Sequence, residues 1–445
     1  MHDFSIIEFS KLKSETAKVF KIKFLHLLKE FKSIPEIKEV DIKNIDQLQQ
    51  VIESSDLVLN YLFRYTLFQG KHILNRYKGY SDNLKDNYLL DINLDDNKPN
   101  RLCQLWIYKV ISLLPSITTT PKSLEASFII ENPQSNFSIE LSEINKIDFK
   151  IDFKDTYLLS FSLNQIHIQQ ISGKYIASFN WDNESEYDGI KLYTKPFFQF
   201  ENHRYSLPFS NFSNIVGSFV ETAVIRSENF VKDFSVQLFD AFSLLKNLGF
   251  SEIFDYFNAI LPFYTYKSYH NSSSPEELSG LILIPSTNEY FPNGVEIMAE
   301  CILHEALHNT LYHLEESTRF YLDKTYLDEI YLSPWRREPR PIRMIIHGCF
   351  VFAPIAFFWQ KLLNKNRNDK NILFHVILRL SQVEFGLDIL KKYARFDTVG
   401  LMVLNSLDNL TSQIRAGLKD FDIIEIEKSV LEGLNNHKAQ YNYKY

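Results

Sequence analysis

Residues 300–316 read Glu-Cys-Ile-Leu-His-Glu-Ala-Leu-His-Asn-Thr-Leu-Tyr-His-Leu-Glu-Glu and contain the pattern H-E-x-x-H as His304, Glu305 and His308. Apolar residues recur here at helical spacing, and neither glycine nor proline interrupts them, so the stretch predicts a helix. Residues four apart share one face of a helix, so the two imidazoles can bind one metal ion. Glu305 is rotated by about 100° from His304 and can lean over the open side of the metal. There it can take a proton from bound water or hold a ligand in place.

The composition is that of an ordinary globular protein. The chain has 445 residues, enough for two or three domains, of which 45% are hydrophobic and 23% charged. Its net charge of −7 gives no electrostatic reason to bind nucleic acid or an anionic membrane. Three cysteines do not make a disulfide framework, and the first residues lack a basic segment followed by an apolar run. We therefore expect a cytoplasmic protein without a signal peptide, and the sequence leaves its oligomeric state open.

The hydrophobic pattern changes twice along the chain. Up to residue 115 apolar residues recur at helical spacing, whereas from there to about Pro208 aromatic and β-branched residues alternate with polar ones, as in strands. Helical patterns then resume. The sequence therefore predicts an α+β protein, mainly α, with a helical N-terminal region (1–115), a β-rich middle subdomain (116–212) and a helical metal-binding catalytic domain (213–445).

The segments before the H-E-x-x-H pattern predict the elements that lead into the motif helix. Ile253–Leu261 has a helical pattern, and Gly280-Leu-Ile-Leu-Ile-Pro285 is typical of a short strand that ends at its proline. We expect the motif helix to begin at Gly294. A strand, a loop and a metal-binding helix in this order are a common way to build a metal cleft.

A second unusual segment follows from Ser333, with three prolines before Ile342. Prolines force an extended approach, and the last of them, Pro341, suits the first turn of a helix. On that helix Arg343 and His347 are four apart and share a face. A third imidazole, with a guanidinium one turn before it, suits a site that binds both a metal and a carboxylate. The alternative is that His347 is a buried core histidine and the arginines are surface charges.

Two known classes of H-E-x-x-H zinc enzyme fit poorly. The metzincin pattern needs a glycine at position 311 and a histidine at position 314, and this chain has Leu311 and Leu314. A gluzincin takes its third ligand from a glutamate on a following helix. Glu329 is the only well-placed candidate, and the residues around it do not form the expected Asn-Glu-x-x-x-Asp pattern.

The two motifs together carry a resemblance to a known family. His304-Glu-Ala-Leu-His308, followed by Pro334-Trp-Arg, by Arg340-Pro-Ile-Arg343-x-x-x-His347-Gly and by an aromatic helix, resembles bacterial H-E-x-x-H proteins encoded near ribosomally made peptides. Members of that family are understood as iron(II)- and 2-oxoglutarate-dependent peptide β-hydroxylases. The resemblance covers roughly residues 215–410. Met344 is a departure, because the family's usual pattern has Arg-Gly there, and the bulkier side chain is expected to narrow the cleft.

The resemblance implies a set of roles. The substrate would be a ribosomally synthesised precursor peptide, hydroxylated at a β-carbon, and the cofactors would be Fe(II) and the co-substrate 2-oxoglutarate. Iron(II) oxygenases leave metal positions open for 2-oxoglutarate and dioxygen, so three protein ligands suffice. We nominate His304, His308 and His347, with Glu305 as the alternative source of a carboxylate. The distal carboxylate of 2-oxoglutarate needs a two-point partner, and Arg343 or Arg340 is suited to it.

Two other functions stay open at the level of sequence. The first is zinc-dependent hydrolysis of a peptide, with Glu305 as the general base and zinc as the alternative metal. The second is a non-catalytic protein that binds peptides or has a structural role and has kept a metal site. The resemblance, and not the spacing of the histidines, favours iron over zinc.

Overall fold

The computed structural model describes 9–35, 37–55, 61–78, 99–117, 126–131, 136–140, 145–150, 156–162, 165–171, 175–180, 190–194, 197–207, 228–263, 272, 274, 276–285, 294–336 and 338–440. The chain forms two compact units. The N-terminal unit comprises residues 13–235 and 257–287, and the C-terminal unit comprises residues 1–12, 236–256 and 288–445.

The N-terminal unit combines helices with antiparallel strands. Its helices are α1 (Phe9–Lys32), α2 (Glu39–Ser54), α3 (Tyr61–Tyr77) and α4 (Pro99–Ile117). Its first nine strands are β1 (Ala126–Glu131), β2 (Asn136–Glu140), β3 (Asn145–Lys150), β4 (Thr156–Ser162), β5 (Gln165–Gln170), β6 (Tyr175–Asn180), β7 (Ile190–Thr194), β8 (Phe197–Phe200) and β9 (His203–Ser206). Trp106 on α4 lies at the centre of the core that helices and strands share; its ring stacks on Phe31 of α1 at 4.5 Å.

The described strands of this unit form three sheets. Two are antiparallel, with the strand orders β1-β4-β5-β6 and β2-β3-β7. The third has the order β11-β10-β9-β8 and includes β10 (Ala259–Phe263) and β11 (Leu281–Pro285), which pair in parallel. The predicted strand at residues 280–285 is therefore confirmed. The helix predicted over Ile253–Leu261 is wrong, because this segment is a short 3-10 turn, η3 (Ser251–Asp255), followed by strand β10.

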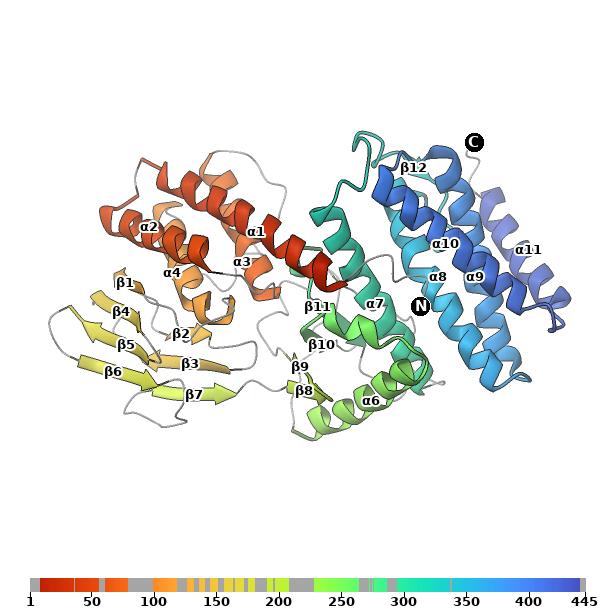
Figure 1. Cartoon of the computed structure of the whole chain (residues 1–445), viewed down its shortest axis with the longest axis horizontal. Helices are drawn as coiled ribbons and strands as arrows, with labels where there is room; N and C mark the ends of the chain where they lie inside the picture. The colour runs from red at the N-terminus through yellow and green to blue at the C-terminus, as the bar shows by residue number, and fades with distance from the viewer. Residues whose placement is uncertain are drawn as a thin grey trace. The chain divides into compact units, whose positions relative to one another are not determined.

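The C-terminal unit is helical (Figure 1). It contains α7 (Gly294–Ser317), α8 (Ile342–Lys365), α9 (Lys370–Tyr393), α10 (Thr398–Gly417), α11 (Ile424–Gln440), the later part of α6 (Glu228–Asn247) and a short ribbon of β12 (Ile330–Tyr331) and β13 (Arg340–Pro341). Together the two units confirm the predicted class, an α+β protein that is mainly α.

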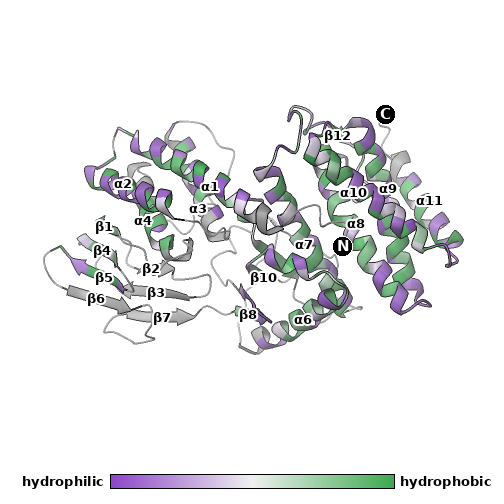
Figure 2. Cartoon of the chain, viewed as in Figure 1, coloured by the Kyte–Doolittle hydropathy of each residue, from purple (hydrophilic) through white to green (hydrophobic). Residues whose placement is uncertain are grey.

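Helix α8 is the central helix of the C-terminal unit. It packs against α7, α9 and α10, and apolar residues cover most of its length (Figure 2). By length and composition it could cross a membrane, yet 78% of its apolar window is buried inside the protein. Within the helix, most residues of the apolar run from Cys349 to Trp359 are buried. Because α8 begins directly after Pro341, the proline fixes where the chain turns into this helix.

Two glycines let helices α8 and α9 share one aromatic side chain. The ring of Trp335 lies over Gly348 of α8, where an added Cβ atom would be 2.3 Å from the ring. A Cβ atom on Gly386 of α9 would be 2.9 Å from the same ring and 2.6 Å from the sulfur of Cys349. Since Gly348 directly follows His347, this packing fixes the part of α8 that carries the second motif.

Candidate metal centre

Helix α7 presents the two motif histidines to each other. The Nε2 atoms of His304 and His308 are 3.2 Å apart, and their rings meet edge to face. Two nitrogens bound to one metal ion at 2.0–2.1 Å, with a tetrahedral angle between them, are about 3.3 Å apart. The separation of the two ring nitrogens therefore fits a shared divalent ion, and helical spacing alone produces it.

The second motif brings a third imidazole from helix α8. The Nδ1 atom of His347 lies 3.2 Å from Nδ1 of His308, and the two rings stack at an interplanar angle of 25°. His347 therefore adjoins the ring of His308 at the nitrogen that does not face His304. As the side chains lie, no three His, Cys, Asp or Glu residues in the described part of the chain share one point as metal ligands. The structure thus brings the three predicted histidines together, and their roles as ligands stay predictions.

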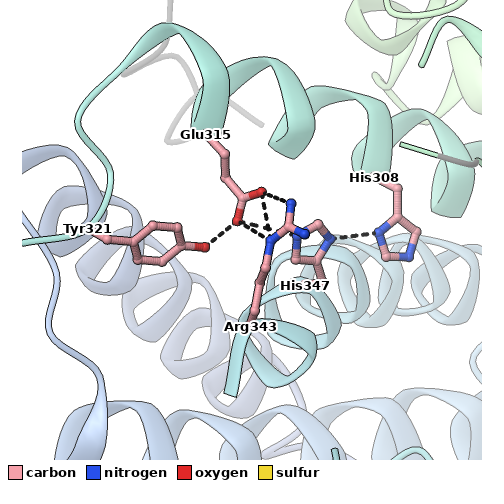
Figure 3. Close-up of polar contacts among 5 residues, drawn as sticks. All are labelled: His308, Glu315, Tyr321, Arg343 and His347. Atoms are coloured by element: carbon pink, nitrogen blue, oxygen red, sulfur yellow. Dashed lines mark hydrogen bonds and ion pairs between the residues drawn. The ribbon is translucent and has the colours of Figure 1, made fainter. Parts of the chain in front are cut away.

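Glu315 completes this side of the site, two turns of α7 beyond His308. Its carboxylate lies 3.4 Å from Nε2 of His347 and accepts hydrogen bonds from Nε and Nη2 of Arg343, the closest at 2.5 Å. The hydroxyl of Tyr321 donates to it as well. Figure 3 shows Arg343 and Tyr321 on either side of the carboxylate, with His347 between Glu315 and His308.

Burial and neighbouring charges set the protonation states of the centre. Burial lowers the pKa of His304 to about 4 and lowers that of His308 well below its usual value, so both imidazoles are neutral at pH 7. Burial opposes the ionisation of Glu315, but the hydrogen bonds and charges of His347 and Arg343 outweigh it and lower the pKa to about 2. The centre therefore offers neutral ring nitrogens beside a permanent carboxylate, which is the chemistry that a divalent cation requires.

Glu305 is almost completely buried, with 1% of its side chain exposed. Its Oε1 atom lies 3.8 Å from Nε2 of His304, the nitrogen that faces His308. The carboxylate therefore lies close to the nitrogen of His304 that faces His308, and its predicted role over a bound metal stays a prediction. It is close enough to act on a molecule bound there, which keeps the role of general base open.

Another buried ion pair lies on the His304 side of the centre. Glu300, one turn before His304, accepts hydrogen bonds from Nε1 of Trp359 at 2.7 Å and from Nη2 of Arg379 at 2.8 Å. The guanidinium of Arg379 lies over the ring of Phe352, whose centroid is 5.1 Å from that of His304. Glu300 thus raises the pKa of His304 and Arg379 lowers it by less, and burial outweighs both and keeps the imidazole neutral.

Three predicted binding residues have other partners or lie apart. Arg343, expected to hold the distal carboxylate of a co-substrate, donates to the chain's own Glu315. Arg340 donates to Glu338 in an exposed pair. Glu329, the one candidate for a gluzincin ligand, is exposed and accepts a hydrogen bond from Tyr331.

Sequence reasoning missed Glu315 and Glu300. Both carried a signal, because Glu300 precedes His304 by four residues and Glu315 follows His308 by seven, so all four residues fall on one side of the same helix. The partners Arg379 and Arg343 come from other helices, and helical spacing carries no information about them.

Comparisons with known proteins add no relative. No family model matches the chain, and none of the curated proteins is similar to it. The resemblance to the peptide hydroxylases therefore rests on the two motifs alone.

Proposed function

We propose that this protein is a metal-dependent enzyme that hydroxylates a β-carbon of a ribosomally made peptide, with Fe(II) as its metal and 2-oxoglutarate as its co-substrate. The observation that supports a metal site is the 3.2 Å separation of the facing Nε2 atoms of His304 and His308, both on neutral imidazoles. The choice of iron and of the reaction comes from the resemblance of the two motifs. A cytoplasmic location belongs to the same proposal.

His304 and His308 would hold the metal ion, which when bound supplies the redox chemistry of the reaction. One oxygen atom of dioxygen enters a C–H bond of the peptide. The other enters 2-oxoglutarate, which releases carbon dioxide and becomes succinate. The chain's own residues position the two histidines, and Phe352 and Trp335, whose rings stack at 5.4 Å, form an apolar wall beside His304. Such a wall excludes water from one side of the centre.

Arg336 is our candidate for the carboxylate of the co-substrate. Its charge acts on His304, and it follows Trp335, which stacks on the same Phe352 ring that His304 contacts. Arg336 is exposed, so an incoming anion can reach it. Arg343 is less accessible, because a co-substrate would first have to displace Glu315 from its guanidinium.

Anaerobic reconstitution tests the proposal without knowledge of the peptide. The protein is loaded with Fe(II) and titrated with 2-oxoglutarate, and the visible charge-transfer band of the complex is recorded. Oxygen is then admitted, succinate is measured, and candidate peptides are examined by mass spectrometry for a gain of about 16 daltons, one oxygen atom. Absence of both the band and succinate would exclude the oxygenase.

Zinc-dependent peptide hydrolysis is the second candidate, favoured by one observation. The carboxylate of Glu305 lies 3.8 Å from Nε2 of His304, where a general base of a metal hydrolase would stand. Zinc-loaded protein would then cleave peptides without 2-oxoglutarate or oxygen. Glu305→Gln would abolish cleavage and retain zinc, and that result would replace the oxygenase proposal.

A further inference from the structure

Five side chains form one continuous line of polar contacts through the centre. From Arg343 the line passes to Glu315 at 2.5 Å, to Nε2 of His347 at 3.4 Å, from Nδ1 of His347 to Nδ1 of His308 at 3.2 Å, and from Nε2 of His308 to Nε2 of His304 at 3.2 Å. His308 therefore has a neighbouring ring nitrogen at each of its own two nitrogens, whereas Nε2 of His347 approaches the carboxylate only at ion-pair distance.

Arg343 and Glu315, at one end of the line, determine which ring nitrogens of the histidines carry protons. Arg343 is only a donor and the ionised Glu315 is only an acceptor, so Nε2 of His347 faces the carboxylate as N–H. If His347 carries a single ring proton, that proton is on Nε2 and Nδ1 is an acceptor. Nδ1 of His308 must then be the donor, because two lone pairs facing each other at 3.2 Å would repel.

The same reasoning determines whether the His308 nitrogen that faces His304 carries a proton. With its proton on Nδ1, His308 turns a bare Nε2 lone pair toward His304, and a lone pair is what a metal ion binds. His347 lies beside the opposite nitrogen of the ring, away from the space between His304 and His308. This position suits a residue that orients the metal-binding His308 better than it suits a residue that binds the metal itself.

We propose that the carboxylate of Glu315 and the imidazole of His347 form a relay of polar contacts that sets the tautomer and orientation of His308, with Arg343 and Tyr321 holding Glu315 in place. All four are positioning residues, and His347 is not a metal ligand. The inference rests on the proposed function only in taking His304 and His308 as ligands, and it holds for iron or zinc. Outer partners of this kind commonly alter metal affinity by about 10- to 100-fold.

The relay is tested first in the metal-free protein. Nitrogen-15 NMR of histidine-labelled full-length protein reports which ring nitrogen carries the proton. We expect the Nδ1–H form for His308 and the Nε2–H form for His347, and loss of the His308 preference in Glu315→Gln. The opposite tautomers in the wild type, or a His347 protonated at both ring nitrogens, would overturn the relay. Because no metal is involved, this result is independent of whether the proposed enzyme activity exists.

Metal affinity supplies the second measurement. Zn(II) is titrated against a chromophoric chelator for the wild type, His308→Ala, His347→Ala, Glu315→Gln and the control Glu296→Gln, which changes a glutamate in the first turn of the same helix. We expect His308→Ala to lose stoichiometric zinc, and His347→Ala and Glu315→Gln to keep one zinc with about 10- to 100-fold weaker binding. The control should bind like the wild type.

Two results would contradict the relay in the zinc experiment. Loss of zinc in His347→Ala as complete as in His308→Ala would make His347 a ligand, provided that circular dichroism shows a folded variant. A zinc-shifted Nδ1 resonance of His347 in the wild type would do the same without any substitution. A wild type that binds no zinc or iron would instead exclude the proposed function, while the metal-free NMR result would still decide the relay.

Discussion

Arg343 and Glu315 form a buried ion pair that joins helix α8 to helix α7. Nη2 of the arginine lies 2.5 Å from Oε2 of the glutamate, and Nε lies 3.2 Å from the same oxygen. Only 7% of the glutamate side chain and 26% of the arginine side chain are exposed. Because the pair stands one turn before His347, it couples the packing of the two helices to the metal centre.

Removing one member of this pair should destabilise the protein. Arg343→Ala leaves the buried carboxylate without its strongest donor, which is expected to cost about 2–4 kcal/mol of unfolding free energy. The double variant Arg343→Ala with Glu315→Gln should recover part of that loss, because no charge is then left unpaired. Denaturant unfolding of the wild type, of Arg343→Ala, of Glu315→Gln and of the double variant measures the coupling, and simple addition of the two single effects would show that the pair does not act as a unit.

The two motif histidines should be equivalent in metal binding. His304→Ala and His308→Ala should each abolish binding and leave the fold largely intact, because each removes one of two facing nitrogens. Metal content by mass spectrometry decides this, with His26→Ala as the control, since its side chain is 74% exposed and lies in the other unit. Stoichiometric iron in either motif variant would end the assignment.

Substitutions of the arginines around the centre should have different effects in a titration of 2-oxoglutarate against the anaerobic iron complex. Arg336→Ala should raise the dissociation constant roughly 10- to 1000-fold, since hydrogen bonds to charged groups contribute about 1.5–3 kcal/mol each. Arg336→Lys should restore binding only in part, because an ammonium cannot form a planar two-point contact. Arg343→Ala should instead weaken metal binding. If Arg343→Ala selectively weakened 2-oxoglutarate, the role of Arg336 would pass to Arg343, as the sequence first suggested.

Acid should destabilise the metal-free protein through His304. Its pKa is about 4 in the folded protein and near 6.5 when unfolded, so the unfolded chain takes up the proton first as pH falls. Stability is therefore fully present above about pH 6.5 and is lost toward pH 4, by an amount on the order of 3 kcal/mol for this group. Denaturant midpoints of the wild type should fall more steeply across this range than those of His304→Asn. Parallel curves would contradict the shift.

A methyl group at position 348 should disturb the packing of the Trp335 ring against helix α8. The added Cβ atom would lie 2.3 Å from the ring, and such overpacking is expected to cost about 1–3 kcal/mol. Gly433→Ala is the matched control, because a Cβ atom there meets nothing within 4 Å and alanine favours the helix by roughly 0.5–1 kcal/mol. Thermal midpoints should therefore move in opposite directions, and an unchanged Gly348→Ala midpoint would show that the ring yields freely.

The sequence was informative where local spacing determines the result. The facing nitrogens of His304 and His308 follow from a helix with no interrupting residue, and the start of α8 follows from Pro341. The parallel pairing that makes Ala259–Phe263 a strand joins it to residues over twenty positions away, and no local periodicity reports such a partner. The occupation of Arg343 by Glu315 was invisible for the same reason, because it depends on how two helices pack.

The two carboxylate–arginine pairs contribute no net charge to the centre. Glu300 with Arg379 and Glu315 with Arg343 cancel each other, and the motif imidazoles are neutral. A divalent cation would thus bring two positive charges that these pairs leave uncompensated and that the carboxylate of Glu305 can offset only in part, in surroundings that screen charge far less than water does. A centre loaded in this way would favour an anion over a neutral molecule of the same shape. In the proposed oxygenase the metal should therefore bind before the anionic co-substrate.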